Sequence, residues 1–117
     1  MKLFDSELRI LNILWEEGDT TAKRLAEILR EQVQWSKTTT YTVIKKCIDK
    51  GVVSRHEPNF VCSALIAKEQ AQETETNELI NKMYGGMPGQ LVASILWRKD
   101  LPPEEIERLK NLINNLT

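Results

Sequence analysis

The first 67 residues carry the pattern that most restricts the fold of this chain. Three helical segments follow one another, "DSELRILNILWEEG", "TTAKRLAEILREQ" and "WSKTTTYTVIKKCIDKG", and each has apolar side chains at offsets of three and four. Two strand-like segments come next, "VVSRH" and "FVCSALI", with Glu57-Pro58-Asn59 as the turn between them. Three helices followed by a β-hairpin predict a winged helix-turn-helix domain over residues 1–67.

Each helical segment carries residues that favour its ends and an apolar stripe that favours burial. Ser, Thr and Asp side chains cap helix N-termini, and glycine suits the left-handed conformation that follows a C-terminus. The expected boundary residues are Asp5 or Ser6 and Gly18 for the first helix, Thr20 or Thr21 for the second, and Ser36 and Gly51 for the third. The stripe of the third helix is Thr40, Val43, Ile44, Cys47 and Ile48.

The third helix has an unusual surface outside that stripe. Four of the five residues from Thr38 to Thr42 are threonines, although Cβ branching favours strands, and residues 35–51 hold four lysines against one acidic residue. In a helix-turn-helix, hydroxyls and amines near the start of this helix bond base edges and phosphates. The residues expected to contact DNA are Ser36, Lys37, Thr38, Thr39, Tyr41, Thr42, Lys45 and Lys46 on the helix and Arg55 in the wing.

The same surface has a simpler interpretation, in which the threonines and lysines only face water. The domain would then be a winged-helix protein-interaction module without DNA binding. The clustering of hydroxyls at the N-terminal end of the third helix favours double-stranded operator DNA as the partner.

The residue types argue against an enzyme. The chain has one histidine and two cysteines, and the cysteines form neither a CxxC nor a CxC motif. We therefore expect no catalytic site, no metal site and no cofactor. Cys47 and Cys62 are expected to be buried core residues. Because no signal peptide or long apolar segment is visible, the chain is expected to be reduced and cytoplasmic.

The second half, residues 68–117, predicts a helical dimerisation region, so the whole chain is predicted to be mainly α-helical with a small β-hairpin. The stretch "AKEQAQETETNE" at its start has no large apolar side chain and is either a solvated helix or a hinge. The short apolar segments that follow cannot close a core alone, so they either fold back on the first domain or pair with a second copy. The polar stretch favours a homodimer. The residues expected at its interface are Leu79, Met83, Leu91, Val92, Ile95, Leu109, Ile113 and Leu116.

The sequence resembles the BlaI/MecI-type penicillinase repressors over nearly its whole length. The resemblance is carried by "ILNILWEEG", "WSKTTTYTVIKKCIDKGVV", "LINKMYGG" and "LPPEEIERLKNLI", and "NKMYGG" before an apolar helix is the most specific part. It implies a homodimeric repressor whose winged helices bind a palindromic operator and whose C-terminal helices dimerise. It also implies a membrane-bound metalloprotease sensor that relieves repression by triggering cleavage within the dimerisation region.

Some residues match the family's pattern and others depart from it. Thr39 and Thr42 coincide with hydroxyl positions of the family's recognition helix, and Lys46 stands where a basic residue is usual. Thr38 and Tyr41 stand where the family often has longer basic or polar side chains, so the resemblance implies a different base preference.

Two further departures concern the wing and the cleavage point. The wing "RHEPNF" is shorter than the family's, which leaves Arg55 as its phosphate contact. Ser94-Ile95 stands where the family has its cleaved Asn-Phe bond, so the resemblance does not carry cleavage over to that point. The paired CxC motifs of related copper-responsive repressors are absent from the sequence.

Overall fold

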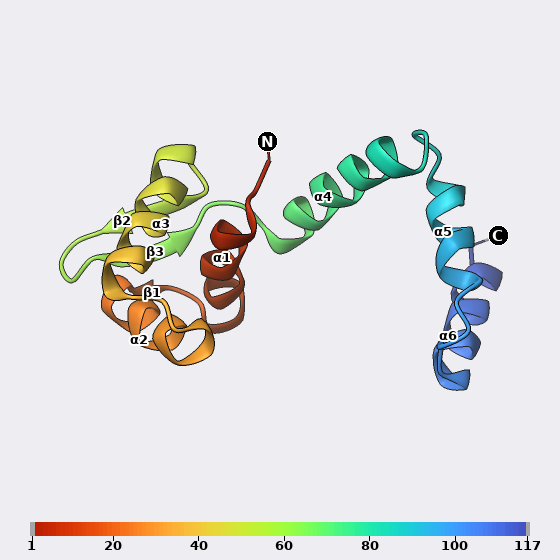
Figure 1. The fold of residues 1–117 in the computed structure, drawn as a ribbon, viewed down its shortest axis with the longest axis horizontal. Helices are drawn as coiled ribbons and strands as arrows, with labels where there is room; N and C mark the ends of the chain where they lie inside the picture. Colours follow the sequence, from red (N-terminus) through yellow and green to blue (C-terminus); the bar gives the residue numbers. More distant parts are fainter. Residues whose placement is uncertain (1, 117) are drawn as a thin grey trace. The chain divides into compact units, whose positions relative to one another are not determined.

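The computed structural model describes residues 2–116 and divides the chain into two compact units, with the boundary between Thr76 and Asn77. The first unit holds α1 (Asp5–Glu17), β1 (Thr20–Thr21), α2 (Ala22–Val33), α3 (Lys37–Lys50), β2 (Val53–His56) and β3 (Val61–Ala64), as Figure 1 shows. The helix α4 (Lys68–Met83) runs through the boundary, and the second unit continues with α5 (Pro88–Leu96) and α6 (Pro103–Asn114).

The helices α2 and α3 begin after the N-cap residues that the sequence predicted, and α3 also ends at the predicted glycine. Thr21 Oγ1 accepts a hydrogen bond from the backbone N–H of Arg24 at 3.1 Å, and Ser36 Oγ accepts one from that of Thr39 at 3.1 Å. Gly51 follows α3 at φ +84°, a conformation that costs glycine no Cβ clash. The prediction of both caps is confirmed.

The start of α1 differs from the prediction. Phe4, rather than Asp5 or Ser6, is the residue that precedes the first helical turn. Glu7 explains the difference, because its Oε1 accepts a hydrogen bond from the backbone N–H of Phe4 at 2.8 Å. A carboxylate within the first turn thus satisfies an amide at the helix start, and no Ser or Asp cap is needed.

The expected hairpin is present, and a third strand extends it. β2 and β3 pair antiparallel, with Val53 opposite Ala64 and His56 opposite Val61. β1 pairs with the other edge of β3, so that the strand order is β1-β3-β2. The sequence did not predict β1, because two residues are too few for an alternating pattern.

The core of the first unit lies between the three helices and this sheet. The helix α3 packs against α1, α2 and β2, and its predicted inward stripe is confirmed, with Ile48 half-buried and the other four residues buried. Burial, together with the nearby Glu7 carboxylate, raises the pKa of the Cys47 thiol to about 12, and burial raises that of Cys62 to about 11. Both cysteines are buried, as predicted. The largest fully buried side chains are Ile10, Leu11, Leu25, Leu29, Ile44, Val52 and Val53, with Thr40 and the two cysteines.

The polar stretch at the start of the second half is helical. It forms most of α4, and Ala71 packs against the core of the first unit. Gly85 and Gly86 end this helix at φ +59° and +77°, and the N–H of Gly86 donates to the carbonyl of Ile80 at 3.0 Å. No residue of α5 or α6 is buried.

Candidate nucleic-acid interface

The exposed side of α3 carries the hydroxyls that the sequence singled out. Ser36 Oγ and Thr39 Oγ1 lie 2.9 Å apart and share one hydroxyl hydrogen, and Thr42 Oγ1 donates to the carbonyl of Thr38 at 2.9 Å. These local bonds fix the direction of each hydroxyl before any partner arrives. The exposed members of the predicted set on α3 and its cap are Ser36, Lys37, Thr38, Thr39, Thr42, Lys45 and Lys46.

The lysines of α3 differ in their surroundings. Lys45 Nζ lies 3.4 Å from Asp49 Oδ2, and both side chains are mostly exposed, so this pair is weakly held. Lys46 is exposed, and its charge helps to lower the pKa of the Glu7 carboxyl. Lys37 Nζ lies 5.7 Å from the centroid of the Tyr41 ring, at the N-terminal end of the helix.

The wing contacts α3 through aromatic rings. The half-buried Tyr41 meets Phe60 edge-on, with 5.8 Å between ring centroids, and the Arg55 guanidinium lies 3.6 Å from the Phe60 centroid. Arg55 Nε also donates to Glu57 Oε1 at 2.5 Å. That hydrogen bond, together with one from the Phe60 amide, lowers the pKa of the Glu57 carboxyl. The structure therefore links Arg55 to the predicted surface of α3.

Two further cations lie beside this surface and were missed by the sequence reasoning. An open hollow of about 220 Å³ is lined by Lys23, Ala26, Glu27 and Arg30 of α2 and by Lys37 of α3. Lys23 and Arg30 are seven residues apart, a spacing that places both on one face of a helix. This spacing is visible in the sequence and would have identified the pair.

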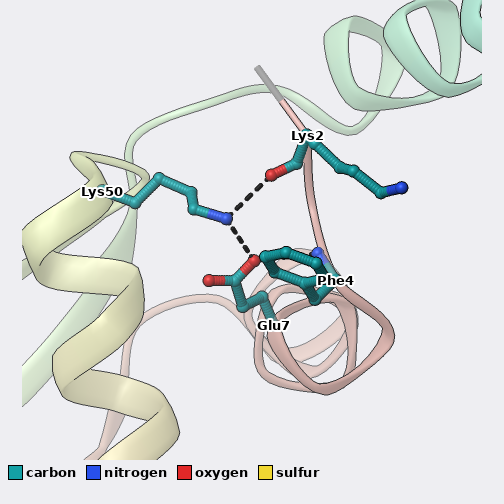
Figure 2. Close-up of polar contacts among 4 residues, drawn as sticks. All are labelled: Lys2, Phe4, Glu7 and Lys50. Carbon is teal, nitrogen blue, oxygen red and sulfur yellow. Dashed lines mark hydrogen bonds and ion pairs between the residues drawn. The ribbon is translucent and has the colours of Figure 1, made fainter.

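The C-terminal end of α3 is fixed to the N-terminal segment by a partly buried ion pair. Lys50 Nζ lies 2.5 Å from Glu7 Oε1 and 2.7 Å from the carbonyl oxygen of Lys2, and it lies 4.7 Å from the centroid of the Phe4 ring (Figure 2). Burial alone would raise the pKa of Glu7, but the hydrogen bonds from Lys50 and from the Phe4 amide outweigh burial and lower it. This ion pair positions α3 against α1.

The residues predicted for a dimer interface lie at the surface of the single chain. Leu91 and Leu109 are half-exposed, and no member of the set is buried. Trp97, just after α5, is 86% exposed and is therefore not a core residue of this chain. The more exposed members of the predicted set are Leu79, Met83, Val92, Ile95, Ile113 and Leu116.

The described residues also bear on metal sites, on the single histidine and on membrane spans. No group of three His, Cys, Asp or Glu side chains within residues 2–116 is arranged to hold a metal ion. The exposed His56 lies on the edge strand β2, with 2.8 Å between its Nε2 and Ser54 Oγ. None of the helices described is both long and apolar enough to cross a membrane.

Comparison with known proteins identifies similar chains. A protein-family model described as "Penicillinase repressor" matches residues 3–115. The chain is 29% identical to the methicillin resistance regulatory protein MecI of Staphylococcus aureus (strain N315), over 97% of this chain and 94% of that protein. It is 23% identical to the penicillinase repressor of Staphylococcus aureus, over 96% of this chain and 90% of that one.

A solved structure has a similar fold. It is the monomeric form of Bacillus licheniformis BlaI in complex with the blaP half-operator, with a TM-score of 0.54 and 22% identity. The match covers 59% of this chain and 87% of that one. The fold prediction, mainly helical with a winged helix-turn-helix, is confirmed by this likeness together with the elements described above.

Proposed function

This chain belongs to the penicillinase repressor family, and we propose that it represses transcription by binding a palindromic operator as a homodimer. The observation that carries the proposal is the exposed side of α3, which presents hydroxyls and lysines while the opposite side is buried. BlaI was solved on a half-operator, and two relatives are named a regulatory protein and a repressor, which supports the same role here. Such a role is carried out in the cytoplasm, where operator DNA lies.

The hydroxyls of α3 are suited to reading bases. Because Thr42 Oγ1 donates to the Thr38 carbonyl, its lone pairs remain to accept a hydrogen bond from the amine of adenine or cytosine. Ser36 and Thr39 use one of their two hydroxyl hydrogens on each other, which leaves the second to donate to a base edge or a phosphate. Lys46 supplies a phosphate contact, which contributes affinity but no base discrimination.

The test is a set of DNA titrations at several salt concentrations, with the DNA upstream of the chain's own gene. Lys46→Ala should weaken binding to all sequences and reduce the salt slope by about one. Thr42→Val removes one hydroxyl at nearly constant volume and should relax base discrimination by roughly 1–3 kcal/mol. Lys99→Ala, outside the proposed interface, serves as the matched control.

The protein-interaction module gives the opposite result in the same titrations. That module requires no duplex DNA, so binding would be absent or insensitive to salt. If the unmodified chain binds no duplex, the alternative replaces the proposal. If it binds DNA and Lys46→Ala and Thr42→Val both titrate like it, α3 is not the DNA-binding element.

The homodimer is supported by the apolar surface of the second unit. The side chains of Leu109 and Ile113 repeat at heptad spacing on α6 and lie exposed or half-exposed in the single chain. A second copy would cover them and would present two winged helices to the two halves of a palindrome. Sedimentation of the intact chain should give twice the mass of the single chain, and a monomer at micromolar concentration would contradict the proposal.

Repression also has to be relieved when the regulated gene is needed. We place a membrane-bound metalloprotease sensor in the pathway, as the family resemblance implies, with cleavage in the second unit as the step that ends repression. No residue of α5 is buried in the single chain, so a protease can cut the monomer that is in equilibrium with the dimer, and the cut chain would not pair again. Mass spectrometry of the protein from induced cells would locate the cut, and an intact chain during full derepression would contradict release by cleavage.

A further inference from the structure

The turn between β2 and β3 is attached to both helices of the helix-turn-helix. Phe60 lies in the left-handed region at φ +53°, and its carbonyl accepts a hydrogen bond from the backbone N–H of Ala22, at the start of α2, at 2.9 Å. Its ring contacts the Tyr41 ring of α3 edge-on. Phe60 therefore determines where the wing lies relative to α3.

Arg55 has two partners in this turn. Its guanidinium lies over the Phe60 ring, 3.6 Å from the centroid, and its Nε donates to Glu57 Oε1. Glu57 Oε2 in turn accepts from the backbone N–H of Phe60 at 3.3 Å. The side chains of Arg55 and Glu57 remain 50% and 59% exposed, so an incoming phosphate can reach the same guanidinium that Glu57 holds.

We propose that Phe60 and Glu57 set the strength of the wing's contact with DNA: Phe60 positions Arg55 toward a backbone phosphate, and Glu57 competes with that phosphate for Arg55. This inference rests on the proposed DNA-binding function and adds two residues that need no DNA contact of their own. A phosphate that binds the Arg55 guanidinium must displace the Glu57 carboxylate, which carries the same sign of charge. The wing therefore contributes less affinity than a free arginine would, and removal of the carboxylate strengthens the contact.

The first experiment measures binding of the full chain to a random-sequence DNA duplex, which reports phosphate contacts without base readout. Glu57→Gln should bind roughly two- to fivefold more tightly, the range that exposed ion pairs contribute. Glu17→Gln makes the same charge change on α1, outside the wing, and should have a smaller effect. In an Arg55→Met background the gain from Glu57→Gln should disappear, because no guanidinium remains to be released.

The second experiment replaces the ring that positions Arg55. Phe60→Leu keeps an apolar side chain but removes the aromatic face, so DNA binding should weaken. The salt slope of binding should fall by less than one, whereas Arg55→Met, which removes the whole phosphate contact, should lower it by about one. Phe60→Tyr keeps the ring and should restore both quantities. Thermal unfolding of each variant separates a loss of positioning from a loss of fold.

The possible outcomes separate this inference from the proposed function. If Glu57→Gln strengthens binding equally with and without Arg55, general repulsion explains the gain, and the competition is wrong. If the unmodified chain binds DNA and depends on Lys46 while the Glu57 and Phe60 variants bind unchanged, only the inference fails. If the unmodified chain binds no duplex at all, the proposed function fails and the inference fails with it.

Discussion

The two units of this chain bury their apolar side chains to opposite extents. In the first unit, Ile10, Leu25 and Ile44 are inaccessible to solvent, and three helices and a sheet enclose them. In the second unit, α5 and α6 bury no residue. Among the described residues, the large hydrophobic side chains that are exposed in the first unit are only Phe4 and Leu65, and the others belong to the second.

The first unit has a core of its own, whereas α5 and α6 of the second unit bury no residue in the single chain. Apolar burial contributes about 25 cal/mol per Å² of surface removed from water, so the first unit has a source of stability within one chain. The second unit gains that contribution only when something covers α5 and α6. In the proposed homodimer, a second copy would supply such a cover and would couple the two units proposed to bind DNA.

The largest expected effect comes from placing charge on the apolar side of α6. The double variant Leu109→Asp and Ile113→Asp would bury carboxylates in the proposed interface, so the dimer should dissociate. Each half-site would then be bound separately, and affinity for the full palindrome should fall by about 10²- to 10⁴-fold. Sedimentation and operator titration measure the two effects.

The control for this variant lies on the same helix. Glu107→Asn and Lys110→Asn change charge at two exposed α6 positions outside the predicted dimer interface and should leave both measurements near those of the unmodified chain. A double-Asp variant that remains a dimer, or that binds the palindrome as before, would contradict the dependence of the second unit on a partner.

Truncating one leucine in each unit tests this difference in burial directly. Leu29 is fully buried, so Leu29→Ala leaves a cavity and should lower the free energy of unfolding by about 2–5 kcal/mol. Leu112 is 52% exposed and is not among the residues predicted for the dimer interface, so Leu112→Ala should cost less than about 0.5 kcal/mol. Chemical unfolding monitored by circular dichroism compares the two, and equal losses would mean that the units do not differ in this way.

The features that the sequence predicted correctly depend on residues that lie close together in the chain. The three helices, their inward stripes and the caps at Thr21 and Ser36 follow from spacing and residue type within about fifteen positions, and they were predicted. The exposed side of α3 followed as the complement of its buried stripe. Family membership was predicted from the motifs and is confirmed by the match over residues 3–115.

The features that escaped prediction depend on residues far apart in the chain. Glu7 and Lys50 are separated by 43 positions, and each looks like an ordinary surface charge in its own helix. The contact of Phe60 with Tyr41 needs a wing folded back on α3, and β1 needs β3 as its partner. Local patterns carry no signal for such pairs, because tertiary packing creates them.

The Glu7–Lys50 pair offers a pH test confined to the first unit. The Glu7 carboxyl is 3% exposed, and its pKa in the folded chain lies below the ordinary value of 4.5. The unfolded chain therefore takes up this proton at higher pH than the folded chain does. The stability that Glu7 contributes is present above pH 4.5 and is lost as the pH falls through the lower pKa of the folded state.

Glu7→Gln isolates that contribution. At neutral pH it leaves the Lys50 ammonium, 22% exposed, without its carboxylate and should cost about 2 kcal/mol, less than the 3–5 kcal/mol for breaking a fully buried pair. The difference in unfolding free energy between the variant and the unmodified chain should shrink as the pH is lowered. A difference that stays constant from neutral pH to well below 4.5 would mean that the carboxylate is not charged in the folded state.

The smallest expected effect concerns one threonine on the buried side of α3. Thr40 is inaccessible to solvent, and its hydroxyl has no hydrogen-bond partner among the described residues. An unsatisfied buried hydroxyl destabilises the fold, so Thr40→Val, which replaces it with a methyl group, should raise the free energy of unfolding by about 1 kcal/mol. Thr40→Ser keeps the hydroxyl and loses the methyl group, so it should lower stability by a similar amount.

Thr40→Val also tests whether the buried and exposed sides of α3 have different roles. Thr39 and Thr42 are exposed and are proposed to contact DNA, whereas Thr40 lies between them in sequence and faces the core. Because no atom of Thr40 reaches the surface, Thr40→Val should stabilise the first unit while DNA affinity and base discrimination stay the same. If Thr40→Val weakened DNA binding as much as Thr39→Val, the hydroxyls of α3 would act through the helix packing rather than through direct contact. The assignment of its exposed side to DNA would then be wrong.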